Sequence, residues 1–123
     1  MTFSLTIRTA EDLATEARQA ERDRIKARRN AALVTGTTVA GMSIATDDTS
    51  QSRITGAALA VTIDPEATVQ WKTGAGFVTL DAAQVIAVAQ AVRAHVQACF
   101  DREAALLAAL EADEAYDIDA GWP

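Results

Sequence analysis

The chain has 123 residues, of which 50% are hydrophobic and 5% aromatic, and its formal net charge is -6. This length allows one domain of ordinary size and excludes a second one. The net charge is +2 over residues 1–35 and -8 over the remaining residues. The acidic total argues against nucleic acid as a partner. The charge difference between the two parts is compatible with head-to-tail stacking of copies and equally with a solvated surface.

The opening segment, TFSLTI, alternates polar and apolar residues, with Phe3, Leu5 and Ile7 on one face. This period of two predicts a strand, and addition to another chain would supply the partner that the segment lacks. Residues 1–8 do not have the apolar region or cleavage site of a signal peptide, and no run approaches about twenty apolar residues. We therefore expect a protein that stays in the cytoplasm of its host after synthesis, with no membrane as a partner.

A first long helix is predicted from Thr9 to about Val34, since the Thr9 hydroxyl can cap the helix and acidic residues follow it. Small residues at spacings of three and four, interrupted at Arg24, form the expected packing seam. The seam consists of Leu13, Ala17, Ala20, Ala27, Ala31 and Val34. Such a seam buries little area per residue, so this helix is expected to need a partner helix.

The middle of the chain is predicted to form two hairpins around a short helix. Ala40-Gly41 separates two short apolar segments, as in a tight hairpin turn, and Gly74-Ala75-Gly76 separates a second pair. Between them, Asp47 begins a helix that Asp64-Pro65 ends, because the residue before a proline avoids helical geometry. Trp71, in the second hairpin, is expected to anchor the core.

A second long helix should begin at Asp81, which can form a capping pair with Gln84, and end near Glu111. Its seam alternates spacings of four and three, which favours packing against the first helix or against another subunit. The seam consists of Val85, Ala89, Val92, Val96, Cys99, Glu103, Leu106 and Leu110.

The last residues form an acidic tail in which Tyr116, Ile118 and Trp122 are interleaved with carboxylates. An acidic tail is disordered by default. Exposing these three apolar side chains is unfavourable, however, so docking on a neighbouring protein is the alternative to fraying.

The stretch from Asp47 to Ala58, DDTSQSRITGAA, resembles the DUF4376 family, a phage-associated domain often found at the end of tail and tail-fibre-related proteins. Further similar positions follow the family's order: Arg28-Arg29, Gly41, Trp71, Val78-Thr79-Leu80-Asp81, His95 and Leu106-Leu107. The resemblance covers about residues 20–112, which divides the chain into an N-terminal segment (1–19), the domain (20–112) and the acidic tail (113–123). It implies a virion-associated role with no known enzymatic activity. Only about twenty residues precede the domain where many members have more, which favours a small piece of the particle over a receptor-binding fibre.

Three groups of residues invite a chemical interpretation, and each has a simpler structural one. His95 and Cys99 could provide two metal ligands, but a structural zinc site needs four. They could also act as a nucleophile and its base, but a cysteine inside a helix has no oxyanion hole beside it. Asp47-Asp48-Thr49 lacks the ligand spacing of a calcium loop and is explained by helix capping. The basic run 22–29 could bind nucleic acid, but it contains Asp23 and its arginines spread around the helix. This arrangement indicates a solvated or partner-pairing face. We therefore expect no catalytic residue, cofactor or metal, and His95 should mediate a packing contact.

The sequence thus predicts an α+β fold with two long helices, one shorter helix and two small β-hairpins. The expected function is that of a structural component of a tailed bacteriophage particle, in the tail, tail tip or tail fibre, located in the virion. Its partners would be further copies of itself and other phage structural proteins. A tail-fibre assembly chaperone and a capsid decoration protein are the alternatives. The candidate interface residues are Phe3, Leu5, Ile7, Tyr116, Ile118 and Trp122.

Overall fold

The structure is a computed structural model and describes residues 8–123. These residues form three helices and two β-hairpins. The elements are α1 (Ala10–Leu33), β1 (Thr37–Val39), β2 (Met42–Ile44), α2 (Asp48–Ile63), β3 (Val69–Thr73), β4 (Gly76–Leu80) and α3 (Ala82–Glu111). The predicted α+β class is confirmed. The strand predicted at residues 2–7 lies outside the described residues.

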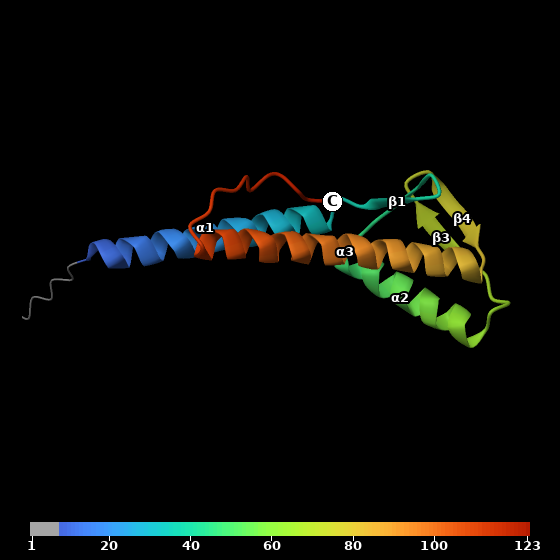
Figure 1. Ribbon diagram of the computed structural model, residues 1–123. Helices are drawn as coiled ribbons and strands as arrows, with labels where there is room; N and C mark the ends of the chain where they lie inside the picture. The colour runs from blue at the N-terminus through green and yellow to red at the C-terminus, as the bar shows by residue number, and fades with distance from the viewer. Residues whose placement is uncertain (1–7) are drawn as a thin grey trace, which may run out of the picture.

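The fold is elongated, with α1 and α3 antiparallel (Figure 1). The C-terminal half of α3 lies along α1, and α1 extends beyond the end of α3. The N-terminal half of α3 instead carries α2 and the hairpins, and we call this end the head. The two paired helices, which we call the stem, and the head therefore share one continuous helix.

The helix starts are those that the sequence predicts, because each has a local capping group. The Thr9 side chain accepts from the Asp12 backbone N–H, and the Asp12 carboxylate accepts from that of Thr9. Asp81 and Gln84 form the same reciprocal pair before α3, with both distances 2.9 Å. Such caps satisfy backbone N–H groups that have no partner inside the helix.

Both predicted hairpins are present, each as its own two-stranded antiparallel sheet. The first turns at Ala40 and Gly41, whose φ angles of 49° and 79° are those of a tight hairpin turn with two left-handed residues. The second has a two-residue loop, because Thr73 pairs with Gly76. Since two-stranded hairpins are marginally stable alone, both depend on packing against the helices.

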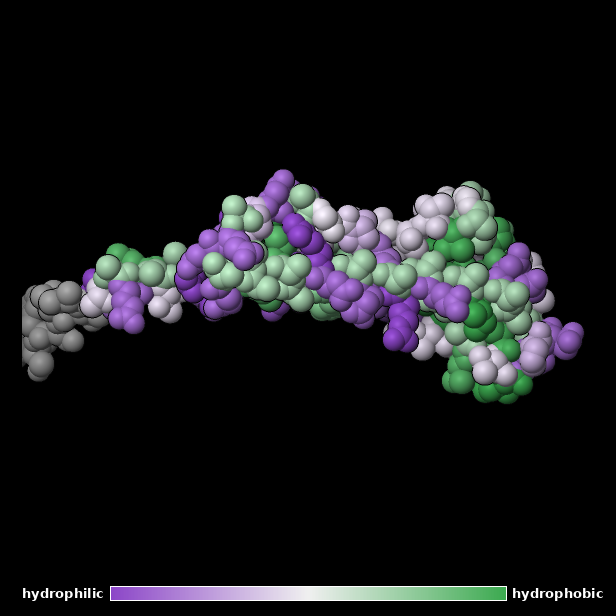
Figure 2. All heavy atoms as spheres, in the orientation of Figure 1, coloured by the Kyte–Doolittle hydropathy of each residue, from purple (hydrophilic) through white to green (hydrophobic). Residues whose placement is uncertain are grey.

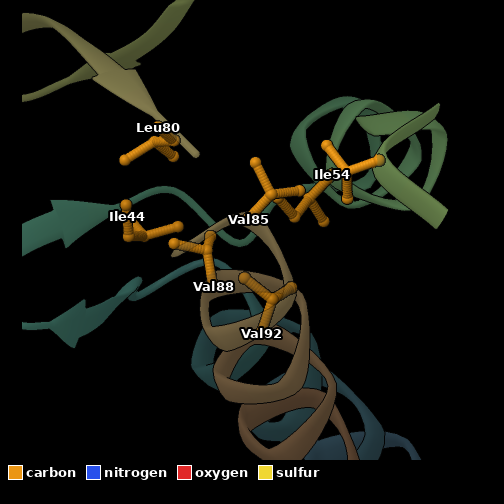
Figure 3. Packing of buried hydrophobic residues seen from close by; sticks show 7 residues of the cluster. Ile44, Ile54, Leu80, Val85, Val88 and Val92 are labelled. Atoms are coloured by element: carbon orange, nitrogen blue, oxygen red, sulfur yellow. The ribbon is translucent and has the colours of Figure 1, made fainter. Parts of the chain in front are cut away.

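The main hydrophobic core lies in the head, where α2, α3 and one strand of each hairpin meet (Figure 3). Its fully enclosed members are Ile44, Ile54, Val61, Leu80, Val85, Val88 and Val92. Trp71 is half-buried and packs against this cluster from β3. Burying one such aliphatic side chain contributes about 1.5–3 kcal/mol, so this cluster fixes the head.

The predicted seam of α1 is wrong. All six of its residues are exposed, with Leu13 at 51% and Val34 at 61%. The helix instead packs on α3 through the face that carries Ile25 and Ala32, which are buried. Half-buried charged residues complete this face, and they are Arg18, Glu21, Arg22, Arg28 and Arg29. Apolar periodicity could not locate a face whose charged side chains find partners on other elements.

The predicted seam of α3 is correct. Val85, Val92, Cys99 and Leu106 are buried, and the intervening seam positions are half-buried. The sequence left open whether its partner is the first helix or another subunit, and within the chain α1 packs on its C-terminal half and α2 on its N-terminal half.

Candidate interaction surfaces

The junction between α1 and α3 is held by one charged contact with little exposure to solvent. One terminal nitrogen of Arg29 donates to both carboxylate oxygens of Glu103, at 2.8 and 3.0 Å. The two side chains are 16% and 14% exposed. The Arg29 guanidinium also lies 4.8 Å from the ring centre of Phe100. Limited water access makes this pair stronger than an ion pair on the open surface.

His95 forms the packing contact that the sequence predicts. Its Nε2 lies 2.9 Å from the backbone oxygen of Ala32, in the last turn of α1. A carbonyl oxygen only accepts, so Nε2 must carry the proton and donate it. This bond ties the middle of α3 to a helix end where carbonyl groups lack partners in the helix.

The His95 and Cys99 pair has no further ligand or catalytic partner in the described part of the chain. The Cys99 sulfur lies 3.9 Å from His95 Nε2, and both side chains are buried. Between residues 8 and 123, no three His, Cys, Asp or Glu side chains are grouped so that they could hold a metal ion. Of the two residues, His95 makes the contact with the last turn of α1 described above.

Burial raises the pKa of the Cys99 thiol above its ordinary value of 9.0, against a smaller opposing effect of the Arg28 charge. The folded state therefore holds this proton more tightly than the unfolded state does. The resulting stabilisation is present below about pH 9 and is lost as the pH rises further. We expect the free energy of unfolding, measured by urea denaturation, to fall more steeply with pH above pH 9 in the parent than in Cys99→Ala. An equal dependence on pH in the two proteins would contradict this.

Because Cys99 is buried, a thiol reagent should label it only at the rate of unfolding.

The C-terminal tail, residues 112–123, folds back along the stem beside α1 (Figure 1). The candidate interface residues Tyr116, Ile118 and Trp122 are all half-buried there. The Tyr116 hydroxyl donates to Glu21 at 2.9 Å, and the pKa of Tyr116 is raised by burial and then by this bond. The Trp122 indole donates to the Ile118 oxygen at 2.8 Å, and the Arg28 guanidinium lies 5.4 Å from the Trp122 ring centre.

Arginines of the stem bind the acidic residues and the backbone of the tail. Along α1, Arg18 pairs with Asp113 at 2.8 Å and Arg28 with Asp119 at 3.2 Å. Arg22 of α1 lies 2.6 Å from Glu111, the last residue of α3, and its hydrogen bond lowers the pKa of that carboxyl. From α3, Arg102 donates to the backbone oxygens of Ala120 and Asp117.

The basic run of α1 therefore finds its partners largely within the same chain. This agrees with the partner-pairing interpretation of that run. The role of Arg102 could not be predicted from the sequence, because its acceptors are backbone carbonyl groups 15 and 18 residues along the chain.

A groove in the head, which we call the β3 groove, was not predicted. It has a volume of about 380 Å³ and lies between β3 and the first turns of α2. Its lining is Ala45, Ser50, Arg53, Ala57, Val69, Gln70, Trp71, Lys72 and Phe77. Among the described residues, Arg53 and Lys72 have no ion-pair partner. The groove thus combines aromatic side chains with two unpaired cations.

Large apolar side chains are also exposed on the head, where hydrophobic residues gather in Figure 2. On α2, Leu59 is 61% and Ile63 76% exposed, and Phe77 of β4 is 70% exposed. Leu59 and Ile63 are four residues apart and lie on the same face of α2. Exposed apolar side chains in such adjacent positions are typical of surfaces that contact other proteins.

A family model described as "Domain of unknown function (DUF4376)" matches residues 16–121. The match extends at both ends beyond the span 20–112 of the resemblance and includes most of the tail. No curated protein and no solved structure matches the chain. Within residues 8–123, none of the helices combines the length and apolar character needed to cross a membrane.

Proposed function

The chain belongs to the DUF4376 family, and from that premise we propose that it is a structural component of a tailed bacteriophage particle, in the tail, the tail tip or an associated fibre. It would act through contacts with other phage proteins and with copies of itself. The phage association comes from the resemblance described above. A role in contacts between proteins is supported by the exposed apolar side chains on the extension of α1 and on the head.

The observation that carries the proposal is the end of α1 that extends beyond α3. Every residue from Arg8 to Ala17 is exposed, including the large apolar side chain of Leu13. A two-turn helical extension without packing has little stability of its own. Contact with a neighbouring subunit would cover Leu13 and fix the extension, as in a component that is completed by assembly.

The exposed apolar side chains of the head give the chain a second contact surface at the opposite end. Leu59, Ile63 and Phe77 belong to α2 and β4, and the extension belongs to α1, so the two surfaces are far apart in the fold (Figure 1). A subunit with a contact surface at each end suits a repeated or bridging position in a larger particle.

Mass spectrometry of purified particles tests this proposal directly. We expect peptides of the chain at a constant molar ratio to the major tail protein after density-gradient purification. Absence from finished particles, together with presence in unfinished tails, would instead indicate an assembly chaperone. A copy number close to that of the major capsid protein would indicate a decoration protein. Absence from both particles and assembly intermediates would contradict the proposal.

A further inference from the structure

The β3 groove runs along the edge of β3 that faces α2, and Phe77 of β4, which pairs with Lys72, also lines it. Four consecutive residues of β3, from Val69 to Lys72, line it. Side chains of a strand alternate between faces, so a groove over one face would meet only every second residue. The opposite wall is α2, which contributes Arg53 and Ala57.

The backbone of β3 has unpaired hydrogen-bonding groups at this edge. Thr73 and Gly76 flank the two-residue loop and form a hydrogen-bonded pair, and such pairs alternate along an antiparallel hairpin. The N–H and C=O groups of Gln70 and Lys72 therefore point away from β4. Neither residue makes another backbone hydrogen bond in the part of the chain that the structure describes. Such an edge is a template for an added strand.

We propose that residues 2–8 of a second copy of this chain add to β3 as a strand and fill the β3 groove. In TFSLTIR, Phe3, Leu5 and Ile7 alternate with polar residues. In an added strand their side chains would face the apolar lining around Trp71 and Ala57, while the main chain bonds to Gln70 and Lys72. This is strand addition, in which the backbone gives affinity and alternate side chains give specificity.

The donor must be another copy because of the length of α1. Residues 2–8 precede α1 at the end of the stem farthest from the head (Figure 1). The 24 residues of α1 span about 36 Å, at a rise of about 1.5 Å each. Seven extended residues reach at most about 25 Å. The segment therefore cannot turn back to the groove of its own chain, and donation between copies runs head to tail.

The charges next to the two surfaces are complementary. The helix start that follows the donated segment carries Glu11 and Asp12 in its first turn, while Glu16 pairs with Arg8. In the complex this acidic end comes close to the β3 groove, whose cations, Arg53 and Lys72, have no partner among the described residues. Opposite charges in these positions would orient the two copies during association.

Sedimentation velocity on the full chain, from about 1 to 300 µM, tests the proposal, which does not depend on the particle association proposed above. We expect concentration-dependent self-association of the parent. Leu5→Glu should abolish it, whereas Thr6→Glu, which adds the same charge on the other face of the strand, should change it less than about threefold. A monomeric parent at 300 µM would overturn the proposal, as would equal effects of the two variants.

A labelled peptide of residues 2–9 identifies the acceptor surface, with the full-length Leu5→Glu chain as its receptor. We expect saturable binding by fluorescence anisotropy, weakened at least tenfold by Arg53→Glu and by less than twofold by Arg93→Glu, which alters an exposed arginine outside the groove. Gln70→Pro removes an outward N–H, a change that edge strands tolerate, and should abolish binding. Binding that is unchanged by Arg53→Glu and by Gln70→Pro would place the segment elsewhere and overturn the proposal, as would an equal effect of Arg53→Glu and Arg93→Glu, or no binding at 1 mM peptide.

Discussion

Removing the tail after Ala112 is expected to lower the free energy of unfolding by about 2–4 kcal/mol while leaving the fold in place. Tyr116, Ile118 and Trp122 are half-buried against the stem, and full burial of one large apolar side chain contributes about 1.5–3 kcal/mol. The cation–π contact of Trp122 with Arg28 adds about 0.5–1 kcal/mol at an exposed site. The core of the head contains no residue of the tail, so the truncated chain still folds.

Urea denaturation followed by circular dichroism measures this effect, in about 20 mM and about 500 mM salt. The loss on truncation should be smaller in high salt, because Arg18 and Arg28 hold the tail partly through exposed ion pairs that salt screens. Ile63→Ala is the control, since that side chain is 76% exposed and its removal should change stability by less than about 0.5 kcal/mol. A truncation with no effect in low salt would mean that the tail does not pack in solution.

A destabilised but folded truncation also has a consequence for assembly. The sequence left docking on a neighbour and fraying as alternatives for the tail, whereas the structure places its three apolar side chains against the stem of the same chain. If truncation weakens incorporation into particles, the cause can therefore be lower stability as well as a lost contact. Glu103→Ala separates the two causes, because it is expected to destabilise the chain by a similar amount at the contact of α1 with α3 while the tail stays in place.

Local sequence signals predicted most of the fold. Thr9, Asp47 and Asp81 begin the helices that they were expected to cap, and the Ala40-Gly41 turn lies where predicted. These features depend on interactions between residues only a few positions apart, so a short stretch of sequence is enough to predict them. The seam of α3 was also predictable, since its partners bury apolar side chains.

Features that depend on residues far apart in the chain were not predictable. The packing face of α1 carries arginines whose partners lie in the tail and on α3, so its periodicity resembles that of a solvated surface. Arg102 binds carbonyl groups of the tail, which no sequence pattern marks. The β3 groove depends on how α2 lies beside β3, although the lack of a third strand-forming segment next to this hairpin was a usable signal for its open edge.

Among the charged residues of the stem, the largest effect of a single substitution is expected at the Arg29–Glu103 pair. Glu103→Ala should destabilise the chain by about 2–3 kcal/mol, because the Arg29 charge stays in a place that is poorly accessible to water. Arg29→Ala should cost a similar amount, since it also removes the contact with Phe100. The double variant should cost clearly less than the two single effects together, with a coupling of about 1–2 kcal/mol.

The pair Arg24–Glu21 provides the control, because it has a similar nitrogen–oxygen distance, 2.8 Å, but more exposure to solvent, with Arg24 at 64% and Glu21 at 23%. Glu21 also accepts a hydrogen bond from Tyr116, so only the coupling between Arg24 and Glu21 is compared, and not the effect of each single substitution. This coupling should stay below about 0.5 kcal/mol, as for exposed pairs one turn apart on a helix. Chemical denaturation of both variant cycles in one buffer compares them directly. Equal coupling in the two cycles would show that water reaches the Arg29–Glu103 pair freely. The contact of α1 with α3 would then depend on Ile25, Ala32 and the His95 hydrogen bond, without a specific contribution from charge.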